Sequence, residues 1–252
     1  MDDFAKVLTA VAALLGAIAW PVTLLALAFL FRGALQTAFG RIPFLLDRVT
    51  KASVAGVKVE LERVADAESE DKSGKVTPKQ KDAAARIAVE KQDVGSQPLL
   101  GELDRLCLEY DALRRTLPPG EIRTRAMTRI IVQMRSLAPS LIEFLDAYRG
   151  SGSAGSRLAA IAMMQMVPTS ADVKWLEGRF SSDPPFLFYH AALALQNAVD
   201  SRDTVEGKLE IREVARRALK QVESLKGEPD PSTIEVLETL ITSLNEIAHG
   251  RQ

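Results

Sequence analysis

Few residues in this 252-residue chain have side chains suited to chemistry. There are two histidines, His190 and His249, and a single cysteine, Cys107. None of them lies in an HExxH, CxxC or His-x-Asp motif. We therefore predict no metal ion and no cofactor.

Cys107 is the one candidate nucleophile, and its surroundings argue against that role. It lies in LDRLCLEY, where leucines flank it on an apolar helical face. A catalytic thiol needs an electropositive and partly open environment. The chain also lacks the GxSxG motif of serine hydrolases. We interpret Cys107 as a core residue and predict no catalytic residue.

The loop Gly150–Gly155, with the sequence GSGSAG, is the one candidate anion site. It precedes a predicted helix that begins at Ser156 and Arg157. Backbone N–H groups at a helix N-terminus can bind an anion, but this loop lacks the preceding strand and the Lys-Ser/Thr pair of a P-loop. The simpler interpretation is a connector in which Ser156 caps the following helix.

The stretch Val7–Phe31 carries no charged side chain, and Lys6 and Arg32 bracket it. About 20 apolar residues suffice to cross the roughly 30 Å hydrocarbon core of a bilayer. We therefore predict a single transmembrane helix, in which Trp20 and Pro21 lie in mid-span and Pro21 introduces a kink. A cleavable signal peptide is the alternative, but its apolar core would be shorter and its start basic.

Small and basic residues give this span a packing face and an orientation. The candidate helix-packing face, through which the protein could form a homo-oligomer, consists of Ala10, Ala13, Gly16 and Ala17. The basic residues that follow the span, as candidate contacts with the inner leaflet, are Arg32, Arg41, Arg48 and Lys51. Because basic flanks stay in the cytoplasm, we predict an inner-membrane protein with its N-terminus outside and its C-terminal domain cytoplasmic.

Four regions follow from composition. Residues 1–32 form the N-terminal tail and the transmembrane helix, and 33–64 form a basic juxtamembrane segment, either a coiled coil, a surface helix or, at its valine-rich end, a strand. Residues 65–97 combine both charge signs with Ser, Gly and Ala. They therefore predict a flexible linker, with one or two helical turns capped by Thr77.

Residues 98–252 predict one cytoplasmic all-α domain. Apolar side chains recur at helical spacing in each segment between the Pro and Gly breaks, and no segment alternates as a strand does. The predicted helices cover about 99–113, 122–137, 141–148, 156–167, 169–180, 185–199, 207–225 and 231–249.

Within this domain, RLAAIAMMQMVP, TSADVKWLEGRF and PPFLFYHAALALQNAV together resemble HEAT-type α-hairpin repeats over about 45 residues. The two related segments begin at Leu158 and Phe188, which are 30 residues apart. This spacing is shorter than the usual period of about 40. Only one and a half repeat units are visible, so a compact helical bundle is the alternative architecture. The resemblance implies a protein-binding surface, for which the candidate residues are Arg157, Trp175, Tyr189 and His190.

The function that we predict from sequence is a membrane-anchored adaptor that binds a cytoplasmic protein partner and is not an enzyme. The alternative is a membrane effector or sensor that oligomerises through its transmembrane helix when it receives a partner or a ligand. An enzyme with an unfamiliar helical active site is a third, weaker hypothesis. The net charge of −1 argues against nucleic acid as a partner.

Overall fold

The computed structural model describes residues 55–71, 73–226 and 230–249. Contacts divide the chain into Met1–Ala52 and Ser53–Gln252, and all described residues belong to the second unit. The predicted span Val7–Phe31, its small-residue face and the bases from Arg32 to Lys51 lie outside the described part. Within that part, no helix combines the length and apolar character that crossing a membrane requires.

The described residues form an all-α domain, which confirms the predicted fold class for the C-terminal region. A helical segment over 55–68 precedes nine further α-helices. These helices are α3 (Pro78–Val94), α4 (Ser96–Thr116), α5 (Glu121–Leu137), α6 (Leu145–Arg149), α7 (Ala154–Met166), α8 (Val173–Ser182), α9 (Pro185–Val199), α10 (Val205–Glu223) and α11 (Pro231–His249). Two 3-10 helices, η1 (Ala138–Phe144) and η2 (Pro168–Ser170), connect neighbouring helices.

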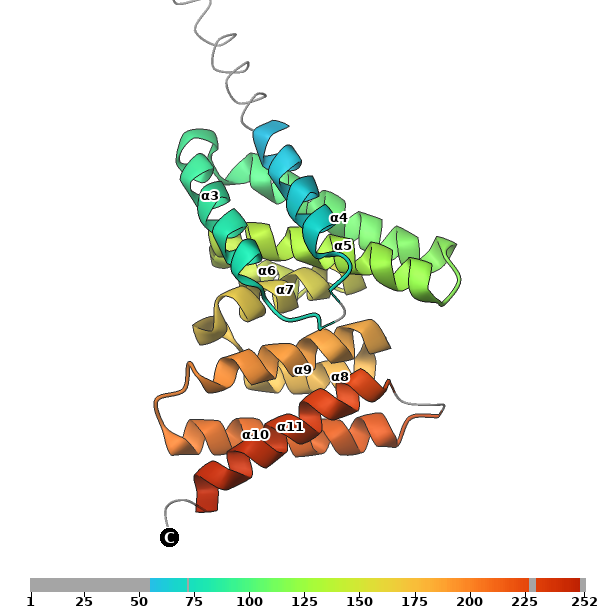
Figure 1. Cartoon of the computed structure of the whole chain (residues 1–252), viewed down its shortest axis with the longest axis vertical. Coiled ribbons are helices and arrows are strands. Elements are labelled where there is room, and N and C mark those ends of the chain that lie inside the picture. The colour runs from blue at the N-terminus through green and yellow to red at the C-terminus, as the bar shows by residue number, and fades with distance from the viewer. Residues whose placement is uncertain (1–54, 72, 227–229, 250–252) are drawn as a thin grey trace, which may run out of the picture. The chain divides into compact units, whose positions relative to one another are not determined.

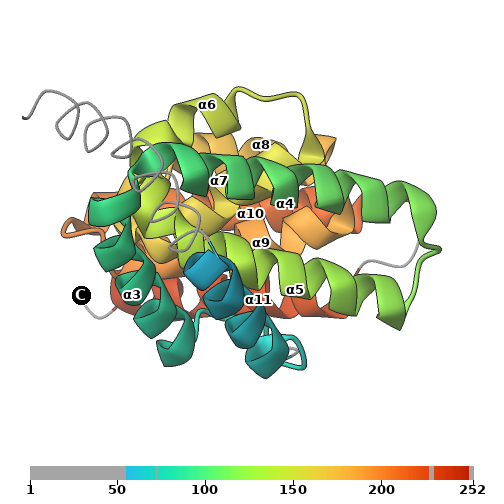
Figure 2. The same ribbon diagram turned by 90° about the horizontal axis from the view of Figure 1, so that it is seen from above.

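The helices lie in successive layers (Figure 1). α4 and α5 run side by side in the first layer, as Figure 2 also shows, and α7 packs against both of them. α8 and α9 form the next layer, followed by α10 and α11. No family and no repeat is identified in this arrangement.

α7 is the central helix of the domain. Every residue from Leu158 to Gln165 is buried, because α4 and α5 pack on one side of the helix and α9 packs on another. A helix that is apolar all round is typical of such an interior position. Its small alanines let the neighbouring helices approach closely, and its methionines fill the remaining space.

The region 65–97 is more ordered than its composition predicts. Thr77 caps α3 as expected, since its side chain accepts a hydrogen bond from the Gln80 backbone N–H. However, the helix continues to Val94 and buries Ala83 and Ile87 completely. Alanines contribute little to hydropathy, but they pack well where helices approach closely, and α3 packs against α5. The described end of the juxtamembrane segment, 55–64, is helical and not a strand.

Candidate functional site

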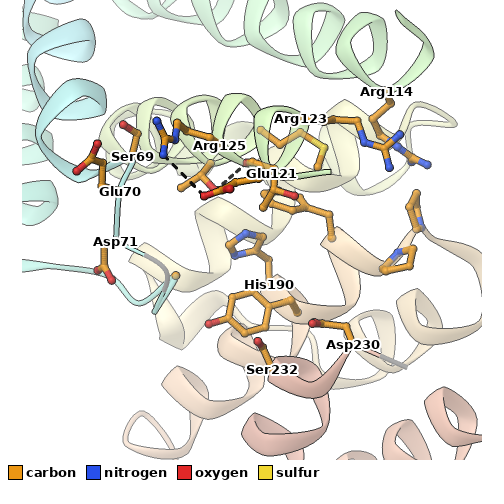
Figure 3. Close-up of a pocket in the computed structure, with 18 residues that line it drawn as sticks. Ser69, Glu70, Asp71, Arg114, Glu121, Arg123, Arg125, His190, Asp230 and Ser232 are labelled. Atoms are coloured by element: carbon orange, nitrogen blue, oxygen red, sulfur yellow. Dashed lines mark hydrogen bonds and ion pairs between the residues drawn. The ribbon is translucent and has the colours of Figure 1, made fainter. Parts of the chain in front are cut away.

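A cavity of about 680 Å³ opens between segments that are far apart in the chain. Its walls are the turn after the 55–68 helix, the first turns of α5 and α9, and the start of α11. Met127 and Phe186 give it apolar wall surface, and His190 of α9 projects into its centre (Figure 3). The end of α4, which carries Arg114, completes the walls, and we take this cavity as the candidate functional site because polar groups from five segments converge on it.

Charged side chains of opposite sign lie at different ends of the cavity. Arg114 and Arg123 lie together at one end, and neither makes an ion pair within the described part of the chain (Figure 3). Glu70 and Asp71 lie at the other end. The remaining wall pair, Arg125 and Glu121, is neutralised internally at 3.9 Å.

Two of the acids that line the cavity also stabilise local turns. Asp71 accepts hydrogen bonds from the backbone N–H of Ser73 at 2.8 Å and from its hydroxyl at 2.9 Å. Asp230 precedes α11 and accepts from the Thr233 backbone N–H at 3.2 Å and from its Oγ1 at 2.7 Å. Both carboxylates are therefore fixed in place by their own segments.

His190 is 2 % exposed, and Arg135 of α5 lies behind it. Nη2 of Arg135 is 3.3 Å from Nδ1 of His190. A guanidinium can only donate, so Nδ1 is the acceptor and the ring hydrogen is on Nε2. Burial first, and then the positive charge of Arg135, lower the pKa of His190 well below its usual value. His190 is therefore neutral at pH 7.

Arg135 is 1 % exposed and is the largest fully buried side chain in the described domain. Its other contacts are all with neutral oxygens: Gln165 Oε1 at 2.7 Å, Gly74 O at 2.6 Å, Gln80 Oε1 at 3.4 Å and Lys75 O at 3.5 Å. Burial lowers the pKa of this guanidinium to about 10, so it remains charged at neutral pH. The network thus contains a buried cation that no carboxylate contacts.

The same network holds the cavity wall together. Gln165 of α7 donates to the His190 carbonyl at 2.6 Å, which fixes the start of α9 against the central helix. The Tyr189 hydroxyl donates to the Ser73 carbonyl, and a side chain on Gly74 would meet the Tyr189 ring at 2.5 Å. Gly74 therefore permits close contact between the turn and α9.

The structure separates the four residues predicted as a partner surface. Tyr189 and His190 line the cavity. Arg157 instead binds Asp183 at 2.6 Å. Trp175 donates through Nε1 to the Arg149 carbonyl at 3.3 Å and lies under the guanidinium of Arg179. Arg157 and Trp175 therefore stabilise the fold away from the cavity.

The Gly150–Gly155 loop is a connector whose anion site the protein fills itself. Ser153, and not Ser156, is the N-cap of α7. Asp111 of α4 accepts from the Gly155 backbone N–H at 2.9 Å and from the Ser153 hydroxyl. Arg157 donates to the Gly152 carbonyl at 2.7 Å and so closes the loop.

Metal ligands and a reactive thiol do not emerge from the described residues. No group of three or more His, Cys, Asp or Glu side chains is placed to hold a metal there. Glu246 precedes His249 by three positions, a spacing seen in carboxylate-bridged metal sites, but one such pair does not complete a site. Cys107 is 4 % exposed, and burial raises its pKa to about 12, which agrees with a core role.

Arg135 is the main residue that sequence reasoning missed. It lies in IIVQMRSLA, where it is the one charged residue among apolar neighbours. Such a residue at the end of a helix usually indicates a solvated turn, yet every residue from Ile130 to Ala138 is buried. The length of that mostly apolar run was the feature of the sequence that could have indicated a buried arginine. The chain matches no known family model, no curated protein and no solved structure.

Proposed function

We propose that this protein is a membrane-tethered binding module whose helical domain docks a protein partner at the cavity. The observation that supports this function is the cavity itself, in which Arg114 and Arg123 form no ion pair with a described residue and Nε2 of His190 donates to none of them. Arg135 and Phe186 hold the His190 ring in place, and a donor that is fixed in advance lowers the entropic cost of binding. Donor groups that are free to bind a ligand favour a cavity that recognises a polar segment of a partner over a cavity with a purely structural role.

The membrane part of the proposal rests on the sequence. Val7–Phe31 has the length and apolar character of a transmembrane helix. The bases that follow it favour a cytoplasmic location for the helical domain and contact with anionic lipid of the inner leaflet. In this proposal, the stacked helix pairs act as a HEAT-like scaffold that displays the cavity.

A second candidate function is a membrane effector or sensor. The small residues Ala10, Ala13, Gly16 and Ala17 favour close approach of two such helices. Occupation of the cavity would then be coupled to oligomerisation. The mass of the full-length chain in detergent tests this: a stable multimer that is lost on Gly16→Leu favours the effector, and a monomer favours the adaptor.

Capture from membranes tests the docking function. The full-length chain and an Arg114→Glu variant are cross-linked in membranes, and the bound proteins are identified by mass spectrometry. The matched control is Arg115→Glu, which makes the same charge change at the next position, on an exposed side chain that does not line the cavity. We expect a partner that the wild type and the control retain and that Arg114→Glu loses. Equal recovery with both variants would refute docking at the cavity.

A further inference from the structure

We propose that the cavity binds a carboxylate group at Nε2 of His190, and that the buried guanidinium of Arg135 supplies its counter-charge through the imidazole. This inference rests on the proposed function, since we take the carboxylate to belong to an acidic side chain or the C-terminus of the docked partner. It adds the chemistry by which that partner is recognised.

The first step is the orientation of the His190 ring. Arg135 occupies Nδ1 at 3.3 Å, which leaves the hydrogen on Nε2. No residue of the described chain accepts a hydrogen bond from Nε2, although His190 lines the cavity wall. Phe186 contacts the ring edge-on, with a centroid distance of 4.5 Å, and holds it in place. Nε2 of His190 is thus a rigidly held donor to which no described residue offers an acceptor.

The second step is the charge behind that donor. Buried charges in proteins are normally paired, because leaving water is costly for an ion. Among the described residues, Arg135 donates only to neutral acceptors. Burial lowers its pKa, and the Tyr189 phenol and then the Asp71 carboxylate partly offset this, but Asp71 makes no ion pair with it. An anion on Nε2 of His190 would therefore complete a chain from guanidinium to imidazole to carboxylate. Each hydrogen bond in such a chain polarises the next one.

The third step is the choice of a carboxylate over a phosphate. The cavity is lined by three arginines and by four acidic residues, Glu70, Asp71, Glu121 and Asp230. A doubly charged phosphate would meet this excess of acids, whereas one carboxylate matches the single charge of Arg135. The acids at the far end would attract a cationic side chain of the same peptide.

The decisive measurement uses the histidine signals of the full-length chain in detergent micelles. The chain has two histidines, so imidazole ¹⁵N labelling gives a simple spectrum in which His190→Phe identifies the His190 signal. We expect sodium acetate to shift the Nε2 signal and to saturate, while sodium chloride at equal ionic strength does not. Inorganic phosphate at equal ionic strength should bind more weakly than acetate.

Two variants test whether the charge of Arg135 contributes to acetate binding. Arg135→Gln should weaken acetate binding by about tenfold or more, because the donor loses its charged neighbour. Arg217→Gln removes an equal charge from an exposed ion pair with Glu177 and should leave acetate binding unchanged. If Arg135→Gln does not fold, the acetate titration of the wild type still tests whether His190 binds a carboxylate. A His190 signal that acetate does not move, or moves no more than chloride does, overturns the proposal.

Partner capture separates this inference from the docking function. Acetate added before cross-linking should prevent capture of the partner by the wild type, and His190→Phe should fail to capture it. If the partner stays bound in both cases, the carboxylate site is refuted and docking stands. If acetate shifts His190 but no protein depends on Arg114 for capture, the docking function is refuted and the carboxylate site stands as a small-molecule site.

Discussion

Nη2 of Arg135 donates a 2.6 Å hydrogen bond to the backbone carbonyl of Gly74, which precedes it by 61 residues. This contact ties the turn after the 55–68 helix to the buried end of α5. The turn is thereby held as a wall of the cavity. We therefore expect the stability of the domain and the shape of the cavity to depend on this guanidinium.

Replacing Arg135 should therefore destabilise the domain strongly. Arg135→Met leaves the Gly74, Gln80 and Gln165 oxygens without their donor, and we expect a loss of about 3 kcal/mol or more in the free energy of unfolding. Arg86→Met is the control, because Arg86 is half-exposed and pairs with Glu60, and it should cost about 1 kcal/mol or less. Urea unfolding followed by far-UV circular dichroism compares the two. Equal losses would contradict the role of Arg135.

His190 should make the domain less stable as the pH falls from 7 to 5. In the unfolded chain a histidine binds a proton below about pH 6.5, but burial and Arg135 keep folded His190 neutral well below that value. The unfolded state then binds more protons than the folded state. The free energy of unfolding therefore decreases as the pH is lowered, by up to about 1.4 kcal/mol per pH unit. His190→Gln should flatten this dependence in equilibrium unfolding. A slope that the substitution leaves unchanged would contradict the prediction.

Asp183 should be among the most sensitive charged residues. Its side chain is fully buried between Arg157 at 2.6 Å and Arg179 at 2.9 Å. Asp183→Asn leaves two cations without their counter-charge and should cost about 3–5 kcal/mol. Glu177→Gln, in a partly exposed pair with Arg217, should cost about 1 kcal/mol or less. Thermal unfolding of both variants tests the contrast.

Two glycines within helices should respond to alanine in opposite directions. A Cβ on Gly155 would lie 2.1 Å from the Cys107 carbonyl oxygen, so Gly155→Ala forces α7 away from α4 and should cost at least about 1–3 kcal/mol. A Cβ on Gly178 meets nothing within 4 Å. Gly178→Ala should stabilise α8 by up to about 1 kcal/mol. Melting temperatures that shift in the same direction would argue against this close contact.

Charges placed in Val7–Phe31 should release the protein from membranes. Each arginine near the centre of a span costs about 2.5–3.5 kcal/mol on insertion. We expect Leu14→Arg combined with Leu25→Arg to move the chain into the fraction that alkaline carbonate extracts. Leu25→Ala should stay with the membrane pellet. Retention of the double-arginine variant would refute the transmembrane prediction.

Much of the helical domain was predictable because its helices have clear stops. The Pro118-Pro119-Gly120 break and the prolines at 185 and 231 predict helix limits within a few residues of those observed. α3 was underestimated, because Ala83 and Ala84 form a buried face that hydropathy hardly registers. Which helices pack together was not predictable, since that depends on close contacts such as Gly155 on Cys107.

The site was predictable only in part. His190 and Tyr189 were among the candidate partner-binding residues predicted from sequence, and both line the cavity. Arg135, Gln165 and Gly74 did not, because their roles depend on contacts over 30 to 61 residues of sequence. Periodicity describes one helix at a time and says nothing about such pairings.

The burial of Cys107 has a practical consequence for labelling this protein. A thiol that is 4 % exposed, with a pKa raised to about 12, reacts slowly with maleimides at neutral pH. The native cysteine therefore need not be removed before a spectroscopic label is attached to an introduced cysteine. A cysteine placed at Ile122, which is 80 % exposed at the start of α5, would carry a fluorophore beside the cavity and report its occupation directly.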